Sequence, residues 1–139
     1  GGGMNDETPA EPDGQGAVAH DAVAAALRCA EAFTERFNAR DAAGMDALLH
    51  FPHAILTGER LTVWDGPGRL ASDYFDKLAA EGWRRSTYLS REPVLASRRK
   101  VHLAIAYTRD GADGAPLSRH QGIWVITFED GRWGVRVRC

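Results

Sequence analysis

The sequence predicts an α+β domain whose helices come first and whose largely antiparallel sheet follows. Up to Gly82, and apart from two short strand-like segments, apolar residues recur at spacings of three and four, which is typical of amphipathic helices. After Gly82 the segments are rich in β-branched and aromatic residues, which is typical of strands. The last two segments flank Asp130-Gly131, a strong hairpin signal because a type I′ turn requires positive φ angles. Strands joined by hairpins pair antiparallel, so the helices are expected on one side of the sheet.

Length and composition indicate one globular domain. The chain has 139 residues, of which 44% are hydrophobic. Residues 1–16 are rich in Gly, Pro, Asp and Glu, and we expect a disordered tail there because they cannot bury enough apolar surface. Met4 is expected to be the natural start, with residues 1–3 left over from expression. The single domain is therefore expected to span residues 17–139.

Charge and cysteine usage argue against several classes of function. The net charge is −2, and the basic run Arg98-Arg99-Lys100 lies between two strand-like segments, where we interpret it as a solvated turn. We therefore expect no nucleic-acid partner. No apolar run is long enough to span a bilayer and no export signal is seen, so we expect no membrane partner and a cytoplasmic location. Cys29 and Cys139 are interpreted as a buried apolar residue and a free thiol.

Three helices are predicted in the first part of the chain. The first covers about residues 19–39. Asp41 is suited to cap a second, short helix over residues 42–49. The third opens at Asp65-Gly66-Pro67, since proline favours the first helical position, and it ends at Gly82. The apolar stripe of the first helix consists of Ala22, Ala26, Cys29, Phe33 and Phe37, and that of the third of Leu70, Tyr74 and Leu78.

Four strands are predicted before the closing hairpin. Residues 53–57 and 60–64 are short strands on either side of a turn. Residues 83–96 and 101–109 are long ones. Pro93 interrupts the first of these, which predicts a sheet edge or a bulge because proline cannot donate a ladder hydrogen bond.

The closing hairpin determines which side chains share a face of the sheet. Glu129 opposes Arg132 next to the turn, and the following pairs alternate between the two faces. One face is predicted to be wholly apolar, with His120 at its far end. The apolar pairs are Phe128 with Trp133, Ile126 with Val135 and Trp124 with Val137; the other face mixes Ile123 and Val125 with Arg136 and Arg138.

Three local motifs carry a resemblance to a known superfamily. The helix end Phe37-Asn38-Ala39-Arg40-Asp41 resembles its N-A-x-D junction, and the segments 49–53 and 122–135 resemble bacterial members. The chain, over about residues 19–139, is thus similar to the nuclear transport factor 2-like superfamily, also called ketosteroid isomerase-like or SnoaL-like. The resemblance implies a cone-shaped, cystatin-like fold in which a curved antiparallel or mixed sheet wraps around the three helices. It also implies a conical small-molecule pocket and a homodimer.

The resemblance does not extend to the ketosteroid isomerase reaction. Those enzymes use an aspartate base and an oxyanion hole made by a tyrosine and a protonated aspartate. Here Phe33 falls at the tyrosine position, and the base position falls near Thr57-Gly58, where no carboxylate is available. The last strands place no aspartate on the apolar face. Scytalone dehydratase-like members use pocket histidines with Asp and Tyr, and this chain has histidines but no motif that assigns them.

Histidines are the main candidates for chemistry. His120 is the best candidate for a catalytic acid or base, since imidazole titrates near neutrality; the alternative is a hydrogen-bonded residue at a strand end. Whether His102 shares its cavity depends on a register that the sequence leaves open. His53 is a candidate at the pocket mouth, and its spacing from His50 does not form a metal motif, so neither metal nor cofactor is expected. The residues expected to contact a ligand are Phe33, Phe37, His53, Trp64, Tyr74, His102, His120 and Trp124.

Three functions are consistent with the sequence. The first is binding of an apolar or aromatic small molecule in the conical pocket. The second adds proton-transfer chemistry of the isomerase, dehydratase or cyclase type. The third is a non-catalytic homodimeric interaction domain, in which the mixed sheet face meets its partner. Whether the protein is an enzyme is left open.

Overall fold

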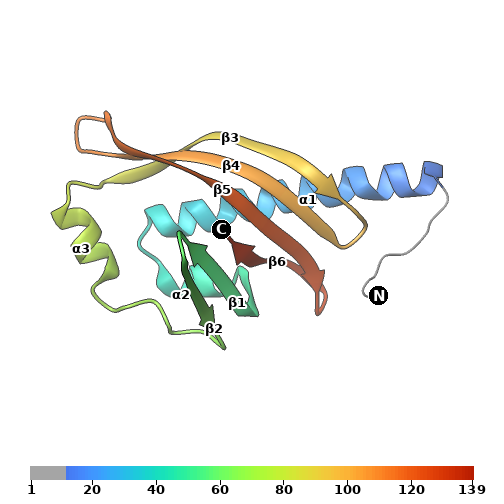
Figure 1. Ribbon diagram of the computed structural model, residues 1–139, viewed down its shortest axis with the longest axis horizontal. Helices are drawn as coiled ribbons and strands as arrows, with labels where there is room; N and C mark the ends of the chain where they lie inside the picture. Colours follow the sequence, from blue (N-terminus) through green and yellow to red (C-terminus); the bar gives the residue numbers. More distant parts are fainter. Residues whose placement is uncertain (1–11) are drawn as a thin grey trace.

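The computed structural model describes residues 12–139, with side chains from Ala19 onward. The described chain contains three helices and six strands. The strands form one curved sheet, and the helices pack against one of its faces (Figure 1). The sheet order is β2-β1-β6-β5-β4-β3. The elements are α1 (Pro12–Asn38), α2 (Ala42–Asp46), β1 (Leu49–Thr57), β2 (Arg60–Trp64), α3 (Tyr74–Ala80), β3 (Arg85–Ala96), β4 (Lys100–Asp110), β5 (Pro116–Glu129) and β6 (Arg132–Arg138).

The sheet is mixed, and its parallel pair lies inside it. Strands β1 and β6 run parallel, whereas every other neighbouring pair is antiparallel. The expectation of a curved antiparallel or mixed sheet is confirmed, and the sheet is mixed through this one pair. Strand β1 pairs with β2 on one side and with β6, the last strand of the chain, on the other. Strand β6 therefore joins the β1–β2 hairpin to the strands β3, β4 and β5.

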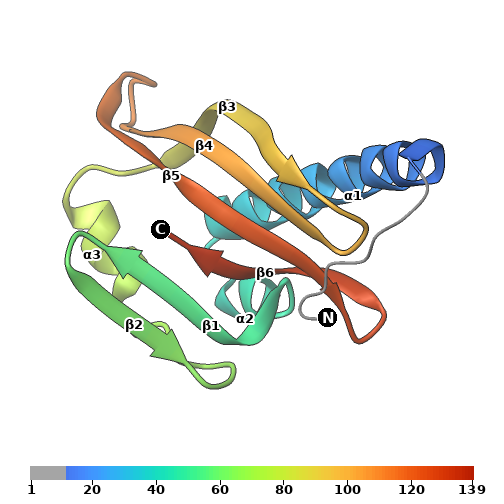
Figure 2. The same ribbon diagram turned by 45° about the vertical axis from the view of Figure 1, so that its right-hand side comes forward.

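Helix α1 supplies the interior side of the core. It contacts β3, β4, β5 and β6, and Figure 2 shows it crossing behind the long strands. The predicted stripe is buried from Ala22 to Phe33, and Phe37 packs at its edge. The helix begins at Pro12, inside the segment predicted to be a tail; residues 1–11 of that segment lie outside the described residues. None of the helices in the described part of the chain is long and apolar enough to cross a membrane.

The short helix α2 is capped as predicted. The carboxylate of Asp41 accepts a hydrogen bond from the Gly44 amide at 2.9 Å. The helix ends at Asp46, earlier than the predicted 49, because Leu49 already belongs to β1 and the Leu48 carbonyl accepts from the Val135 amide at 2.8 Å.

Helix α3 is shorter than predicted. It spans Tyr74–Ala80, and the segment 65–73 forms bends and turns instead of a helix that opens at Pro67. Gly68 has a φ of 83°, which a right-handed helix cannot include, and its amide is bound by the Asp46 carboxylate at 2.9 Å. The predicted end is confirmed: Gly82 has a φ of 103°, and the Trp83 amide donates to the Leu78 carbonyl at 3.2 Å, as in a Schellman motif.

The two long strands after α3 behave as predicted. Strand β3 forms the edge of the sheet, and its pairing with β4 is irregular between Pro93 and Leu95. On β4 the residues Val101, Leu103 and Ile105 are buried toward α1. The odd-numbered side chains of this strand therefore face the interior of the cone.

The closing hairpin follows the predicted register only near its turn. Asp130 and Gly131 have φ angles of 53° and 77°, as a type I′ turn requires. The first four pairs, from Glu129–Arg132 to Ile126–Val135, are the predicted ones. A β-bulge then inserts Arg136 as an extra residue, so that Val125 opposes Val137 and Trp124 opposes Arg138.

This bulge corrects the predicted faces of β6. A shift of one residue turns every later side chain to the other face of the sheet. Arg138, predicted on the mixed outer face, instead lies beside Trp124 on the interior face.

Candidate functional site

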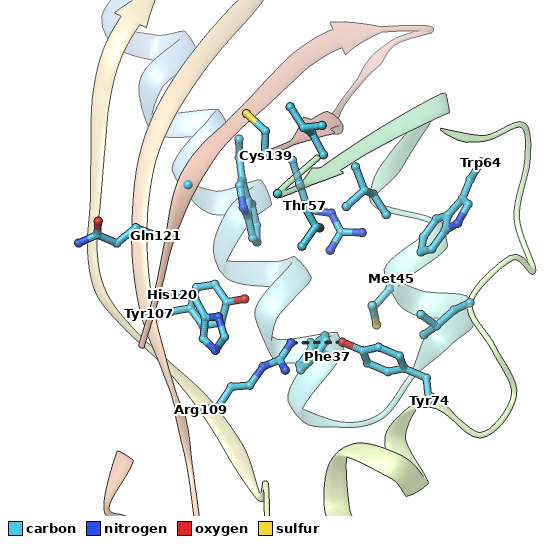
Figure 3. A pocket seen from close by; sticks show the side chains of 17 residues that line it. Phe37, Met45, Thr57, Trp64, Tyr74, Tyr107, Arg109, His120, Gln121 and Cys139 are labelled. Carbon is cyan, nitrogen blue, oxygen red and sulfur yellow. Dashed lines mark hydrogen bonds between the residues drawn. The ribbon is translucent and has the colours of Figure 1, made fainter. Parts of the chain in front are cut away.

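A cavity of about 450 Å³ opens between the interior face of the sheet, α3 and the loop before α3 (Figure 3). An adjoining recess of about 70 Å³ leads toward α1 and shares Tyr74 and Trp124 with it. The volume falls within the range of small-molecule sites in proteins. The aromatic and aliphatic wall of the cavity consists of Phe37, Met45, Ile55, Leu56, Trp64, Leu70, Tyr74, Tyr107 and Trp124, and the recess adds Phe33 and Tyr88.

Edge-to-face contacts hold the aromatic wall in place. The rings of Phe33 and Trp124 have centroids 5.4 Å apart at 86°, and those of Phe37 and Tyr74 are 6.1 Å apart at 77°. Such pairs are favourable because the positive edge of one ring meets the negative face of the other. The wall therefore presents fixed aromatic surfaces to the cavity.

Arg138 is the most unusual residue of the cavity. The bulge in β6 turns it inward, where it lines both the cavity and the recess. Its Nε donates to Nε2 of His53 at 3.0 Å, and its guanidinium carbon lies 4.9 Å from the ring centroid of Phe33. Burial lowers the pKa of Arg138 to about 10, opposed by the nearby tyrosines. At neutral pH the side chain therefore remains a cation.

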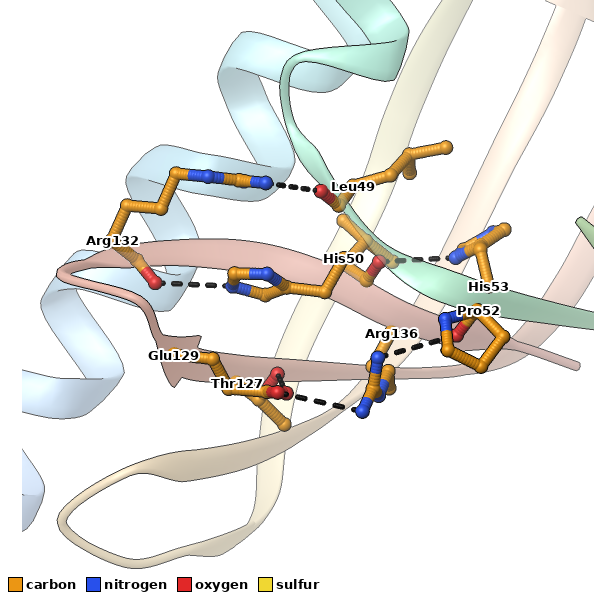
Figure 4. A network of polar contacts seen from close by, with 9 residues as sticks. Leu49, His50, Pro52, His53, Thr127, Glu129, Arg132 and Arg136 are labelled. Atoms are coloured by element: carbon orange, nitrogen blue, oxygen red, sulfur yellow. Dashed lines mark hydrogen bonds and ion pairs between the residues drawn. The ribbon is translucent and has the colours of Figure 1, made fainter. Parts of the chain in front are cut away.

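His53 lies behind the cavity wall and contacts Arg138. It is fully buried, and its Nδ1 lies 3.0 Å from the Val135 carbonyl, to which it can only donate (Figure 4). The other ring nitrogen is then the lone-pair acceptor for the Nε–H of Arg138. Burial, helped by the positive charge of Arg138, lowers the pKa of His53 to about 4. The prediction of a pocket-mouth residue is corrected: the neutral imidazole orients Arg138 and is not among the residues that line the cavity.

His50 has a structural role in the same region. Its Nε2 donates to the Arg132 carbonyl at 3.1 Å, while the Arg132 guanidinium donates to the Leu49 carbonyl at 2.7 Å (Figure 4). Beside it, Arg136, the bulged residue, pairs with Glu129 at 3.4 Å. These contacts tie β6 to the start of β1. Among the described residues, no group of three or more His, Cys, Asp or Glu side chains could hold a metal ion.

Arg109 brings a second guanidinium to the cavity. It extends the interior face of β4, and its Nη2 donates to the Tyr74 hydroxyl at 3.3 Å (Figure 3). Its Nε is buried and has no hydrogen-bond partner within the described part of the chain. An unpartnered buried donor is costly unless a ligand or water satisfies it.

His120 lines the cavity, on the face that the sequence predicts. Its ring stacks on that of Tyr107 at 5.0 Å and 18°, and its Nε2 lies 2.8 Å from the Ser118 hydroxyl. Burial, together with the charge of Arg109, lowers its pKa. His120 is thus neutral at physiological pH and able to accept a proton.

His102 does not share this cavity. It opposes Val125 on the outer face, because it has the opposite parity along β4 from Tyr107, which opposes His120. The prediction of His102 as a ligand contact is therefore corrected by the strand register. Of the remaining predicted contacts, Phe37, Trp64, Tyr74 and Trp124 line the main cavity and Phe33 lines the recess.

Sequence reasoning missed several polar residues of the site, among them three that carry aromatic rings or charge toward the cavity and one in the recess. Those in the cavity are Tyr107, Arg109 and Arg138, and the one in the recess is Tyr88. A signal for Tyr107 and Arg109 was present, since both have the parity of Leu103 and Ile105. Nothing comparable pointed to Arg138, because its face depends on the bulge.

The charged side chains of the site are cations, and its other polar side chains are neutral. Of the residues that the structure describes, no aspartate or glutamate lines either the cavity or the recess. The Tyr88 hydroxyl is already used: it accepts from Thr34 at 2.7 Å and donates to the Ala30 carbonyl at 2.9 Å. Burial raises the pKa of Tyr88 to about 12, so this hydroxyl stays neutral. The site can therefore attract negative charge, and its side chains include no carboxylate base.

Comparison with known proteins shows the fold. No protein-family model matches this sequence, and no curated protein matches it. Among solved structures, a protein of unknown function with a cystatin-like fold from Nostoc punctiforme has a TM-score of 0.65 and 11% identity, covering 82% of this chain and 85% of its own. Aln2 from a Streptomyces species has a TM-score of 0.64 and 17% identity, covering 94% and 91%. A ketosteroid isomerase-like protein from Erwinia carotovora atroseptica has a TM-score of 0.58 and 18% identity, covering 84% and 92%.

These likenesses confirm the resemblance found in the sequence at the level of the fold. All identities lie below a fifth, so they carry no information on ligand or reaction. The chain has the cone-shaped, cystatin-like α+β fold of the nuclear transport factor 2-like and ketosteroid isomerase-like proteins.

Proposed function

We propose that the protein binds an aromatic small molecule in the cone-shaped cavity. The observation that carries this proposal is the cavity of about 450 Å³ with aromatic rings on several sides. Rings of Phe37, Trp64, Tyr107 and Trp124 offer both faces and edges, which suit a flat aromatic ligand. Ligand sites in proteins typically combine such an apolar wall with a few polar groups that fix orientation, and His120 and the arginines supply those groups here.

Filling the cavity tests this proposal. Leu70 lines the cavity, so the larger side chain of Leu70→Trp should occupy ligand space. Leu61 is 64% exposed on β2 and is not a lining residue, which makes Leu61→Trp a matched control. The probes are 2-naphthoate and its neutral amide, with affinity measured by calorimetry. At least one probe should bind wild type and the control variant, and Leu70→Trp should weaken it at least tenfold.

Two outcomes would contradict the proposal. One is that neither probe binds wild type at millimolar concentration. The other is that both tryptophan variants bind equally well, although thermal melts show that both are folded.

A second candidate function is proton transfer by His120. The observation that favours it is a partly buried, neutral imidazole facing the cavity, next to a guanidinium that could stabilise an enolate. We expect the protein to accelerate the exchange of the α-protons of 2-tetralone for deuterium, followed by NMR. His120→Ala should lose this acceleration, and His20→Ala, an exposed residue of α1, should keep it. Equal exchange rates with and without protein would rule out this role for that ketone.

A further inference from the structure

Resting on the proposed function, we propose that the ligand is an aromatic carboxylate whose anionic group is bound by the guanidinium of Arg138, with Arg109 as a second cationic contact. The inference names the charge and the chemical class of the ligand. It depends on the bulge in β6, which brings Arg138 inward, and on the cavity residues around it.

The first step is the direction of the free donors of Arg138. Its Nε donates a hydrogen bond to Nε2 of His53 at 3.0 Å. Its guanidinium carbon lies 4.9 Å from the ring centroid of Phe33 and 5.9 Å from that of Trp64. The side chain lines both the cavity and the recess, so the part of the guanidinium that is not covered by these contacts faces the cavity. The terminal N–H groups are thus available as a fork, a geometry that matches a carboxylate.

The second step is the missing counter-charge. Within the described residues, the ion pairs of arginine and lysine all lie elsewhere, for example Arg136 with Glu129 and Arg36 with Asp41. No described acidic side chain lines the cavity or the recess, yet both contain Arg138 and Arg109. A partly buried cation without a carboxylate partner is unfavourable in the empty protein, and an anionic ligand would remove that cost.

The third step is the buried donor of Arg109. Its Nε has no partner in the described part of the chain, while its Nη2 is held by the Tyr74 hydroxyl at 3.3 Å. Tyr74 itself stacks edge-on against Phe37 in the aromatic wall. Arg109 is therefore fixed beside the rings that would hold the body of the ligand.

The fourth step is the choice of His53 as the partner of Arg138. A carboxylate at this position would neutralise the guanidinium, whereas a neutral imidazole orients it and leaves its charge for the ligand. His53 is thus a positioning residue. The arrangement has the features of a pre-organised anion site, in which the orientation of the cation is fixed before binding.

The test compares three ligands that share one ring system: 2-naphthoate, 2-naphthamide and 2-naphthylmethylammonium. Affinities are measured by calorimetry at pH 7.5 with the full chain. Charge-assisted hydrogen bonds to a guanidinium predict that wild type binds the carboxylate about 10 to 100 times more tightly than the amide. The ammonium compound should bind more weakly than the amide.

Variants assign this preference to Arg138. Arg138→Met should reduce the ratio of the two affinities to within about threefold, because the carboxylate loses a charge-assisted hydrogen bond and the amide only a neutral one. Arg119→Met, at an exposed residue of β5 outside the cavity, should keep the wild-type ratio. If Arg138→Met does not fold, Arg138→Lys retains the charge without the fork and should give an intermediate ratio.

The ligand series in wild type remains decisive even if every variant fails to fold. Equal affinity for carboxylate and amide would overturn the inference while leaving aromatic binding intact. An unchanged ratio in folded Arg138→Met would overturn the assignment to Arg138. Absence of binding by all three ligands would instead contradict the proposed function itself.

Discussion

At the scale of single residues, the pair His53–Arg138 determines the character of the site. The Nδ1–H of the histidine donates to the Val135 carbonyl and its Nε2 accepts from Arg138, so both ring nitrogens are satisfied only in the neutral form. Protonation would place a second cation against the guanidinium inside the protein. The structure therefore requires a neutral His53 whenever Arg138 is charged.

This requirement predicts a loss of stability in mild acid. The pKa of His53 is about 4 in the folded protein and 6.5 for an ordinary histidine. Between these values the unfolded chain binds a proton that the folded chain does not, so the free energy of unfolding falls as the pH drops from about 6.5 to 4. The contribution of His53 should amount to about 2 kcal/mol between pH 7.5 and pH 5. Urea unfolding at both pH values measures it.

Two histidine variants isolate that contribution. His53→Gln can still accept from Arg138 but does not titrate, so its stability should depend less on pH by the stated amount. His20→Gln removes an exposed histidine of α1 and should keep the wild-type dependence. A pH dependence that is identical in all three proteins would show that His53 is not held neutral by the fold.

At the scale of the elements, strand β6 shows where prediction from sequence stops. The turn at Asp130-Gly131 fixes the register locally, and the first four pairs follow from it. Beyond them, contacts from far along the chain decide: the Val135 amide binds the Leu48 carbonyl, and Arg136 binds both Glu129 and the Pro52 carbonyl. A bulge set by such tertiary contacts cannot be predicted from the alternation of apolar and polar residues along the strand. For this reason the sequence pattern predicts the wrong face for Arg138.

Gly134 allows the close approach that this junction needs. A Cβ there would lie 2.8 Å from the Arg132 guanidinium and 2.8 Å from the ring of His50, and both side chains are held by hydrogen bonds. Gly134→Ala should therefore lower the free energy of unfolding by about 1–3 kcal/mol. Gly66→Ala, where a Cβ would meet no atom within 4 Å, is the control and should change it little. Equal urea midpoints for the two variants would contradict the role of Gly134.

At the scale of the whole molecule, the order of elements and the fold were predictable because they depend on local patterns. The stripe of α1, the cap of α2, the end of α3 and the edge position of β3 all follow from such patterns. The apolar part of the site was predictable for the same reason, since strand parity places Trp124 and His120 on one face. The parallel pairing of β1 with β6 was not, because it joins segments about 80 residues apart that share no turn.

Homodimer formation remains a prediction for the whole molecule, and the outer face of the sheet is where it is expected. No described helix lies on that face, and it carries the half-buried side chains of Ile123, Val125 and Val137. Wild type should sediment at twice the mass of one chain at micromolar concentration. Val125→Lys should sediment as a monomer, since a partner would bury its charge without a counter-ion. Ala79→Lys, at an exposed position of α3, should remain dimeric because it adds the same charge away from that face. A monomeric wild type would contradict the prediction, and a Val125→Lys dimer would place the interface on another surface.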